Sequence, residues 1–238
     1  MDAMAHVARS VIASAVAGYA ALQVLGRTAG SSSGERAAWR PGDDLVDRPQ
    51  LVTNHAITTD VPADRVWPWL TQMGWHLGGY YTPEWVDRYL FPANWSSLDH
   101  LDPALVRDLQ PGDIIPDGKP GTAQYVVHEA RSPHLLVLRS STHLPPGWDT
   151  RFGTTFVWTW CFQLTDMPGD RSRIHLRVRG RSAPWWLTVL YVGALVPADL
   201  IMAMGMLRGL KQRAESDAPL QPSGRDPFNP DTVPLFTG

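Results

Sequence analysis

The chain has 238 residues, 44% of them hydrophobic, and a formal net charge of −2. This charge balance provides no basic surface that would attract nucleic acid, so no nucleic-acid partner is expected. The single cysteine, Cys161, excludes an internal disulfide, and no Cys/His cluster has zinc spacing, so we expect neither a metal nor a cofactor. The 11 tryptophans are unusual for this length and suit a lined cavity, a membrane interface or a heavy core.

The N-terminal segment contains an uncharged run, residues 10–26, between Arg9 and Arg27. As a helix this run would span about 25 Å, slightly less than the ~30 Å hydrocarbon core of a bilayer. It is typical of a membrane anchor, a signal segment or a helix packed on the domain. We assign residues 1–30 to an N-terminal apolar helix that can anchor the chain in a membrane, and the polar residues 31–48 to a linker.

The next segment, residues 49–215, has the pattern of one α+β domain. It opens with a β-branched strand over 51–59, a turn at Pro62 and a helix, and a second short helix is predicted over 83–90. A loop-rich stretch then leads to four further strands, predicted over 122–130, 134–141, 154–166 and 171–181. Short turns between these strands predict an antiparallel meander.

Two of the strands have a strong two-residue period. The strand over 154–166 places a stripe of mostly aromatic residues on one face, namely Phe156, Trp158, Trp160, Phe162 and Leu164. In the strand over 171–181, apolar residues alternate with Arg173, His175, Arg177 and Arg179. This second pattern predicts a half-buried strand whose basic face is solvated.

The last apolar run contains one charged residue, Asp199, and one internal proline, Pro197. Residues 185–207 are long enough to span a bilayer, and the alternative is a helix packed inside the domain. Asp199 either lines a pocket or begins the last helical segment after Pro197, and we favour the second interpretation. Residues 216–238 contain five prolines and no periodicity, which predicts a disordered tail.

The order of these elements resembles the helix-grip order of the START/Bet v 1-like (SRPBCC) superfamily. The stretch TTDVPADRVWPWLTQMGW resembles the opening strand, turn and helix of that superfamily. LQPGDIIPDG and LIMAMGMLRGLKQRAE resemble the G-D turn and the C-terminal helix of a bacterial polyketide cyclase/dehydrase-like subgroup. The resemblance covers roughly residues 50–215. It implies a curved antiparallel sheet wrapped around a long C-terminal helix, with a cavity for apolar ligands between them and the two short helices at its mouth.

The resemblance also implies where a ligand would bind. The implied ligand-binding residues are Trp67, Trp69, Trp75, Tyr125, Phe156, Trp158, Trp160, Phe162 and Met202. The alternative is that the aromatic stripe forms ordinary core and packs on the helix without a void, as such stripes more often do.

Catalytic residues stay unassigned, because the zincin, Walker and nucleophile-elbow spacings are all absent. Some polar residues would act as acids or bases if they faced an apolar pocket. These candidates are His55, Asp99, His100, Asp102, Arg139, His143 and Asp149. Loop Asp and His residues more often form caps and turns, however.

Together these observations predict the binding or transfer of a hydrophobic, lipid-like or polycyclic small molecule in an internal cavity. The alternative is a polyketide cyclase/dehydratase-type enzyme that acts on an aromatic substrate in the same cavity. We expect the protein at a membrane with its domain on the cytoplasmic side, since Arg27, Arg36 and Arg40 follow the apolar helix. A soluble cytoplasmic protein is the alternative, and the oligomeric state stays open.

Overall fold

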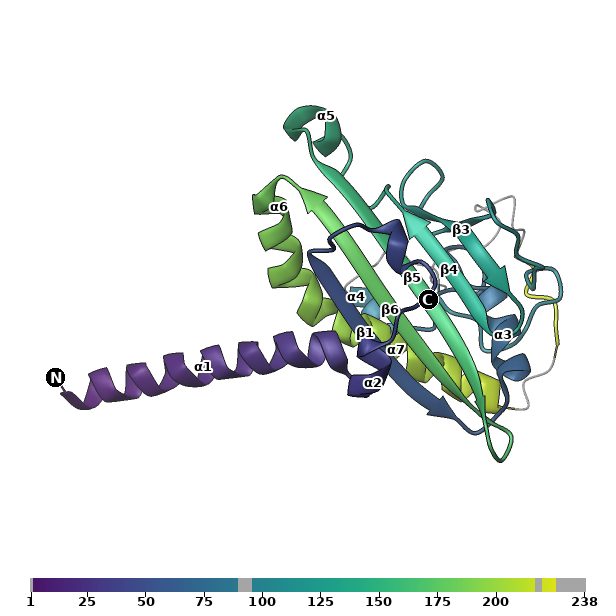
Figure 1. Ribbon diagram of the computed structural model, residues 1–238, viewed down its shortest axis with the longest axis horizontal. Helices are drawn as coiled ribbons and strands as arrows, with labels where there is room; N and C mark the ends of the chain where they lie inside the picture. The colour runs from purple at the N-terminus through teal and green to yellow at the C-terminus, as the bar shows by residue number, and fades with distance from the viewer. Residues whose placement is uncertain (1, 90–95, 217–219, 226–238) are drawn as a thin grey trace.

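The computed structural model describes residues 2–89, 96–216 and 220–225. The chain forms an α+β domain in which a curved, six-stranded antiparallel sheet wraps around a long C-terminal helix (Figure 1). A long N-terminal helix, α1 (Asp2–Thr28), projects from this domain. This is the helix-grip architecture, so the predicted fold class is confirmed.

The sheet has the strand order β1-β6-β5-β4-β3-β2. Its strands are β1 (Leu51–Thr59), β2 (Ile114–Pro116), β3 (Gln124–Arg131), β4 (Leu135–Ser140), β5 (Thr155–Met167) and β6 (Arg171–Ala183). The sequence pattern does not predict β2, because its three residues lie between turn signals. A short helix, α5 (Trp148–Phe152), precedes β5 and is also not predicted.

Strands β1 and β2 lie at opposite edges of the sheet, so the chain between them must cross the domain. This crossing contains α3 (Ala63–Thr71) and α4 (Glu84–Tyr89), the two short helices that the sequence predicts. Helix α3 packs against the C-terminal helix and against β5 and β6. The crossing therefore closes one end of the space between the sheet and the C-terminal helix.

The inner face of the sheet is apolar and forms the main core. Strands β5 and β6 make a long hairpin in which Trp160 lies opposite Val178 and Phe162 lies opposite Leu176. Because successive side chains of a strand alternate between its two faces, these four residues share the face that meets the C-terminal helix. They belong to one buried cluster with residues of that helix, such as Leu207.

The C-terminal helix runs through three segments without a break. These are α6 (Trp185–Leu190), a π-helical turn (Tyr191–Leu195) and α7 (Val196–Glu215). Helix α7 packs on the inner face of the sheet, where Leu207 and Leu210 are fully buried. A π-turn locally widens a helix and is frequent at functional sites.

Helix α1 is joined to this C-terminal helix by side chains that donate to its backbone. Pro197 has no N–H, so one carbonyl group of the preceding turn loses its usual donor. The Tyr19 hydroxyl donates to the Gly193 carbonyl at 2.8 Å, and Gln23 Nε2 donates to the Val192 carbonyl at 3.1 Å. Helix α1 thus supplies donors to the turn in which Pro197 leaves a carbonyl without its usual partner.

The segment 31–48 connects α1 to the sheet and also packs on it. It contains α2 (Ser33–Ala37) and a 3-10 turn (Asp43–Leu45), which lie on the outer face of the sheet. Arg177 of β6 extends into this segment and donates to the Asp43 carboxylate at 2.7 Å. The same guanidinium donates to the carbonyl oxygens of Glu35, Arg36 and Ala38.

The prediction of a solvated basic face on β6 is therefore wrong. Arg177 is only 4% exposed, and His175 is buried beside it. The physical reason is that the segment 31–48 supplies carbonyl and carboxylate acceptors, which allow the guanidinium groups to leave water. The alternation in β6 marks two covered faces rather than one buried and one solvated face.

Two helices in the described residues are long and apolar enough to cross a membrane, Arg9–Thr28 and Trp185–Glu215. The first is almost entirely uncovered: Val11, Ile12 and Val16 are each more than 60% exposed. The second includes α7, whose inner side belongs to the domain core. Core helices and membrane spans share length and apolarity, so these two properties alone do not assign a span.

Most of the tail predicted to be disordered, residues 216–238, lies outside the described residues. Residues 220–225 are described, and they lie against the loop that follows α4. The Gln221 amide donates to the Leu101 carbonyl at 2.9 Å, and the Ser223 amide donates to the Asp102 carboxylate at 2.8 Å.

Candidate functional site

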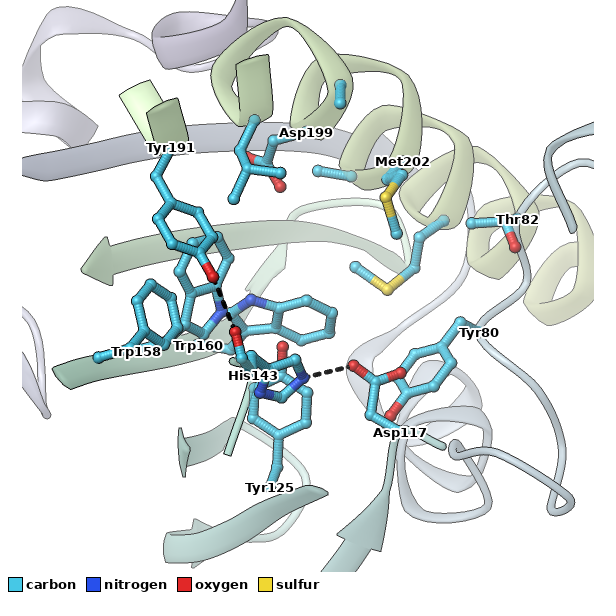
Figure 2. A pocket seen from close by; sticks show the side chains of 15 residues that line it. Tyr80, Thr82, Asp117, Tyr125, His143, Trp158, Trp160, Tyr191, Asp199 and Met202 are labelled. Carbon is cyan, nitrogen blue, oxygen red and sulfur yellow. Dashed lines mark hydrogen bonds and ion pairs between the residues drawn. The ribbon is translucent and has the colours of Figure 1, made fainter. Parts of the chain in front are cut away.

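A cavity of about 290 Å³ lies between the inner face of the sheet and the C-terminal helix. Small-molecule sites usually occupy about 300–1,000 Å³, so this cavity suits a small ligand. Figure 2 shows its side chains. The sheet contributes Tyr125, Phe156, Trp158 and Trp160, the helix contributes Tyr191, Leu195, Ala198, Asp199, Met202, Ala203 and Met206, and loops contribute Tyr80, Thr82, Asp117 and His143.

Five of the nine implied ligand-binding residues line this cavity: Tyr125, Phe156, Trp158, Trp160 and Met202. The stripe on β5 is therefore divided, because its first three aromatic residues face a void and the remainder form packed core. The other four implied residues, Trp67, Trp69, Trp75 and Phe162, do not line the cavity.

The four residues that do not reach the cavity pack elsewhere in the domain. Trp69 and Phe162 are almost completely buried in the core, and Trp67 packs against the same cluster. Trp75 is also buried. Helix α3 lies against the sheet and α7, so its tryptophans fill the space between these elements rather than the mouth of a pocket.

The first polar group of the cavity is centred on Asp199. Its Oδ2 atom accepts a hydrogen bond from the Thr53 hydroxyl at 2.9 Å and lies 3.1 Å from His55 Nε2. Asp199 lies in the first turn of α7 after Pro197, as the favoured interpretation has it, but its carboxylate also lines the cavity. Because the π-turn leads into α7 without a break, the carboxylate bonds to side chains of β1 instead of to a free helix N-terminus.

The second polar group is centred on His143, which lies in the loop between β4 and α5. His143 Nε2 is 2.7 Å from Asp117 Oδ2, and its Nδ1 is 2.7 Å from the Ser140 hydroxyl. The Tyr191 hydroxyl donates to the His143 carbonyl at 2.9 Å, which ties this loop to the π-turn. Both ring nitrogens of His143 thus have partners.

Asp117 is the main site residue that sequence reasoning does not find. It follows β2 in the stretch Pro116-Asp117-Gly118, where an aspartate is typical of a turn. Tyr80 and Tyr191 are also not predicted, because neither lies in a periodic strand. The order of elements indicates a cavity, but only the packing of loops onto the sheet brings these residues to it.

Two buried phenols stand beside the carboxylates. Burial raises the pKa of Tyr125 well above its ordinary value, and the negative charges of Asp117 and Asp199 raise it further. Burial and Asp117 also raise the pKa of Tyr80, whose hydroxyl donates to the Pro116 carbonyl at 3.0 Å. Both phenols are therefore neutral at physiological pH.

The indole nitrogens of Trp158 and Trp160 are buried and have no hydrogen-bond acceptor within the described part of the chain. The Trp158 N–H lies close enough to the Tyr125 phenol to lower its pKa slightly against the effect of burial, but it makes no hydrogen bond of normal geometry. An unpartnered buried donor costs about 1–3 kcal/mol. These two donors therefore favour an occupant with an oxygen acceptor.

The remaining polar candidates lie elsewhere. Asp99 pairs with His100 at 2.9 Å, and Asp102 accepts hydrogen bonds from Ser223, so these three belong to the loop after α4. Arg139 and Asp149 are exposed and do not line the cavity. Across the described residues, no three His, Cys, Asp or Glu side chains come together in a way that could hold a metal ion.

No protein-family model matches the chain, and no curated protein matches it. Hypothetical protein jhp0584 from Helicobacter pylori, a solved structure, is 13% identical with a TM-score of 0.47 and covers 75% of this chain and 96% of its own. CalU16 from Micromonospora echinospora is 17% identical with a TM-score of 0.32. The match covers 69% of this chain and 83% of CalU16. DynU16, from the dynemicin biosynthetic locus, is 14% identical with a TM-score of 0.38. The match covers 71% of this chain and 51% of DynU16.

Since all three TM-scores are below 0.5, these similarities do not bear on activity. The assignment of the fold rests on the strand order and on the helix that the sheet encloses. The chain is thus identified by its architecture, a helix-grip domain with an aromatic cavity between sheet and helix.

Proposed function

We propose that this protein binds a hydrophobic small molecule, lipid-like or polycyclic, in the cavity between the sheet and the C-terminal helix. The observation that supports this proposal is the composition of the cavity wall. Eleven of its fifteen residues are aromatic, aliphatic or methionine. Burial of apolar ligand surface against such a wall is favourable by about 25 cal/mol per Å².

Two features of the cavity wall favour a bound ligand over an empty cavity. Met202 and Met206 line the helix side, and methionine adapts its shape to different apolar partners. The unpartnered N–H groups of Trp158 and Trp160 lie on the sheet side and favour an occupant with an oxygen acceptor.

We further propose that the protein acts at a membrane, with α1 as its anchor and the domain on the cytoplasmic side. The exposed apolar length of α1 supports this location. So does an aromatic cluster where α5 and α6 meet, in which Trp186 lies 5.9 Å from Trp148 and 6.1 Å from Phe152. Trp185 next to it is 76% exposed, as is typical of aromatic side chains at a bilayer interface.

The test of ligand binding is to identify molecules that co-purify with the full chain. The protein is extracted from membranes in polymer-bounded discs without detergent, and its organic extract is examined by mass spectrometry. A variant with a filled cavity, Ala198→Phe, provides the comparison, because Ala198 lines the cavity. The control is Ala104→Phe, since Ala104 is exposed and lies outside the cavity.

We expect one apolar compound in near-stoichiometric amount with the unmodified chain and with Ala104→Phe, and its loss from Ala198→Phe. Identical extracts from all three proteins would contradict the proposal. Circular dichroism of Ala198→Phe separates loss of ligand from loss of fold.

The location is tested by removing residues 2–18, which leaves the Tyr19 and Gln23 contacts in place. We expect the shortened chain to move from the membrane fraction to the soluble fraction. If it still sediments with membranes after a carbonate wash, α1 is not the anchor.

A second function, a polyketide cyclase/dehydratase-type enzyme, is favoured by one observation. One ring nitrogen of His143 is hydrogen-bonded to the Asp117 carboxylate and the other to the Ser140 hydroxyl. His143 and Asp117 line the cavity. Such an imidazole can transfer a proton to or from a bound carbonyl compound. If the protein is an enzyme, His143→Gln should abolish conversion of an aromatic polyketide-like ketone while binding of that ketone survives.

A further inference from the structure

We infer that the ligand of this cavity is a cationic amine with an apolar body, whose ammonium group lies against Asp199. This inference rests on the proposed ligand-binding function and names the ligand class. It is carried by the charge of the cavity wall. The wall contains two carboxylates, Asp117 and Asp199, and none of the residues described as lining it is an arginine or a lysine.

The two carboxylates differ in how far the protein encloses them. His143 Nε2 lies 2.7 Å from Asp117 Oδ2, and the Ser140 hydroxyl lies 2.7 Å from Nδ1 of the same ring. The Asp117 side chain is 23% exposed, so water also reaches it. Asp117 is therefore the less enclosed of the two carboxylates.

Asp199 is the more enclosed of the two. Its partners are the Thr53 hydroxyl and Nε2 of His55, which is fully buried. None of the residues described as lining the cavity brings an arginine or a lysine to this carboxylate.

The carboxylate of Asp199 is also accessible to a ligand. Its hydrogen bonds to Thr53 and His55 both end on Oδ2, and no donor among the described residues reaches Oδ1. The side chain lines the cavity and is 11% exposed. A buried carboxylate is costly unless it is paired, so an occupant with a positive group is favoured at this point.

The walls around Asp199 suit the same ligand. Tyr191 lies on the same helix, and its ring stacks on Phe156 with 4.9 Å between the ring centroids, while the Trp158 and Phe156 ring centroids are 5.5 Å apart. Figure 2 shows Tyr191, Trp158 and Asp199 around the same cavity. Aromatic faces attract ammonium groups through their quadrupoles, and quaternary amines are recognised in this way. A carboxylate together with several aromatic rings therefore selects a cation and disfavours an anionic ligand such as a fatty acid.

The experiment compares matched probes on the full chain in phosphatidylcholine nanodiscs. Trimethyl(4-phenylbutyl)ammonium is compared with its neutral isostere, 5,5-dimethylhexylbenzene, in which carbon replaces nitrogen, and with the anion 5-phenylpentanoate. Affinities are measured by calorimetry after subtraction of empty discs. We expect the cation to bind about 10-fold more tightly than the neutral isostere, with the anion weakest.

The preference should depend on one residue. In Asp199→Asn the ratio between cation and isostere should fall to about one, while the isostere still binds, which shows that the cavity is intact. Asp108→Asn is the charge-matched control, because Asp108 is exposed and lies outside the cavity, and it should keep the full ratio.

Equal binding of the cation and the isostere to the unmodified chain would overturn the inference and leave the proposed function standing. A preference that persists in Asp199→Asn would overturn the assignment to Asp199. If none of the three probes binds, the proposed ligand-binding function itself is contradicted.

Discussion

The two faces of the sheet are both covered, yet they are covered in opposite ways. On the outer face the segment 31–48 fits closely onto β6, and Arg177 finds an acceptor for each of its donor nitrogens. On the inner face the C-terminal helix leaves a cavity, in which two indole N–H groups have no acceptor in the described residues. The ring nitrogens of His175 on the outer face also lack a partner among the described residues, so the two faces differ in packing rather than in hydrogen bonding.

This difference indicates where stability and binding reside. A closely packed region loses free energy of unfolding when one side chain is removed, because its neighbours cannot relax. Removal of a side chain that borders a cavity lowers the free energy of unfolding by less. Its main effect is expected on the affinity for a ligand. Stability measurements on matched pairs of residues can test this division.

The largest expected effect is at Arg177. Arg177→Met should lower the free energy of unfolding by about 3–5 kcal/mol, because the Asp43 carboxylate loses its nearer cation and keeps only Arg179 at 3.6 Å. The measurement is urea denaturation of the full chain in one mild detergent. The control is Arg181→Met on the same strand, whose side chain is exposed and should change stability by less than about 0.5 kcal/mol. Equal losses would mean that the outer face is not a bonded unit.

The next effect compares two positions on α7. Leu207→Ala should cost about 3 kcal/mol, because Leu207 is fully buried in the packed part of the inner face. Met202→Ala should cost less than about 1 kcal/mol, since Met202 is partly exposed and already borders the cavity. The same denaturation assay applies. A loss at Met202 as large as that at Leu207 would show that the cavity wall is packed like core.

A smaller effect concerns pH and the outer face. Arg173 donates to Glu35 at 2.8 Å and 3.0 Å, which lowers the pKa of that carboxyl from 4.5 to about 2. The unfolded chain binds this proton first as the pH falls, so the stabilisation is complete above pH 4.5 and is lost toward pH 2. Because the pair is partly solvated, the contribution should be only about 1 kcal/mol.

Glu35→Gln should therefore be less stable than the unmodified chain at pH 7 and equal to it near pH 2, in thermal melts across this range. Glu84→Gln serves as the control, because the Glu84 side chain is 72% exposed. A difference that does not change with pH would exclude the ion pair as its cause.

The smallest expected effect is at Cys161, on the outer face of β5. Burial raises the pKa of its thiol to about 12, and the residue is 4% exposed. We expect no reaction with Ellman's reagent at pH 8 in the folded protein and one thiol per chain after unfolding in urea. Rapid labelling of the folded protein would show that the segment 31–48 opens from the sheet.

Much of the fold can be predicted from the sequence, because the pattern that marks a strand lies within the strand's own residues. The two-residue alternation in β5 and β6 defines their length and their two faces within a few residues. The order of elements then indicates the helix-grip arrangement. The short strand β2 and helix α5 have no such periodic signal and cannot be found this way.

The cavity is less accessible to sequence reasoning. The alternation in β5 shows that Phe156, Trp158, Trp160 and Phe162 share a face, but not that the first three border a void and the last does not. That division depends on the curvature of the sheet and on the path of the C-terminal helix. Asp117 and the covered face of β6 depend in the same way on segments that pack together from distant parts of the chain.

The hydrogen bonds between α1 and the turn before Pro197 have a consequence for orientation. A domain on a flexible tether tumbles beneath its anchor, so any one side of it faces the bilayer only part of the time. The bonds from Tyr19 and Gln23 fix the angle between α1 and the C-terminal helix instead. A bilayer that holds α1 would therefore meet the domain in a single pose, and the frequency with which a molecule enters the cavity would depend on that pose rather than on rotation of the domain.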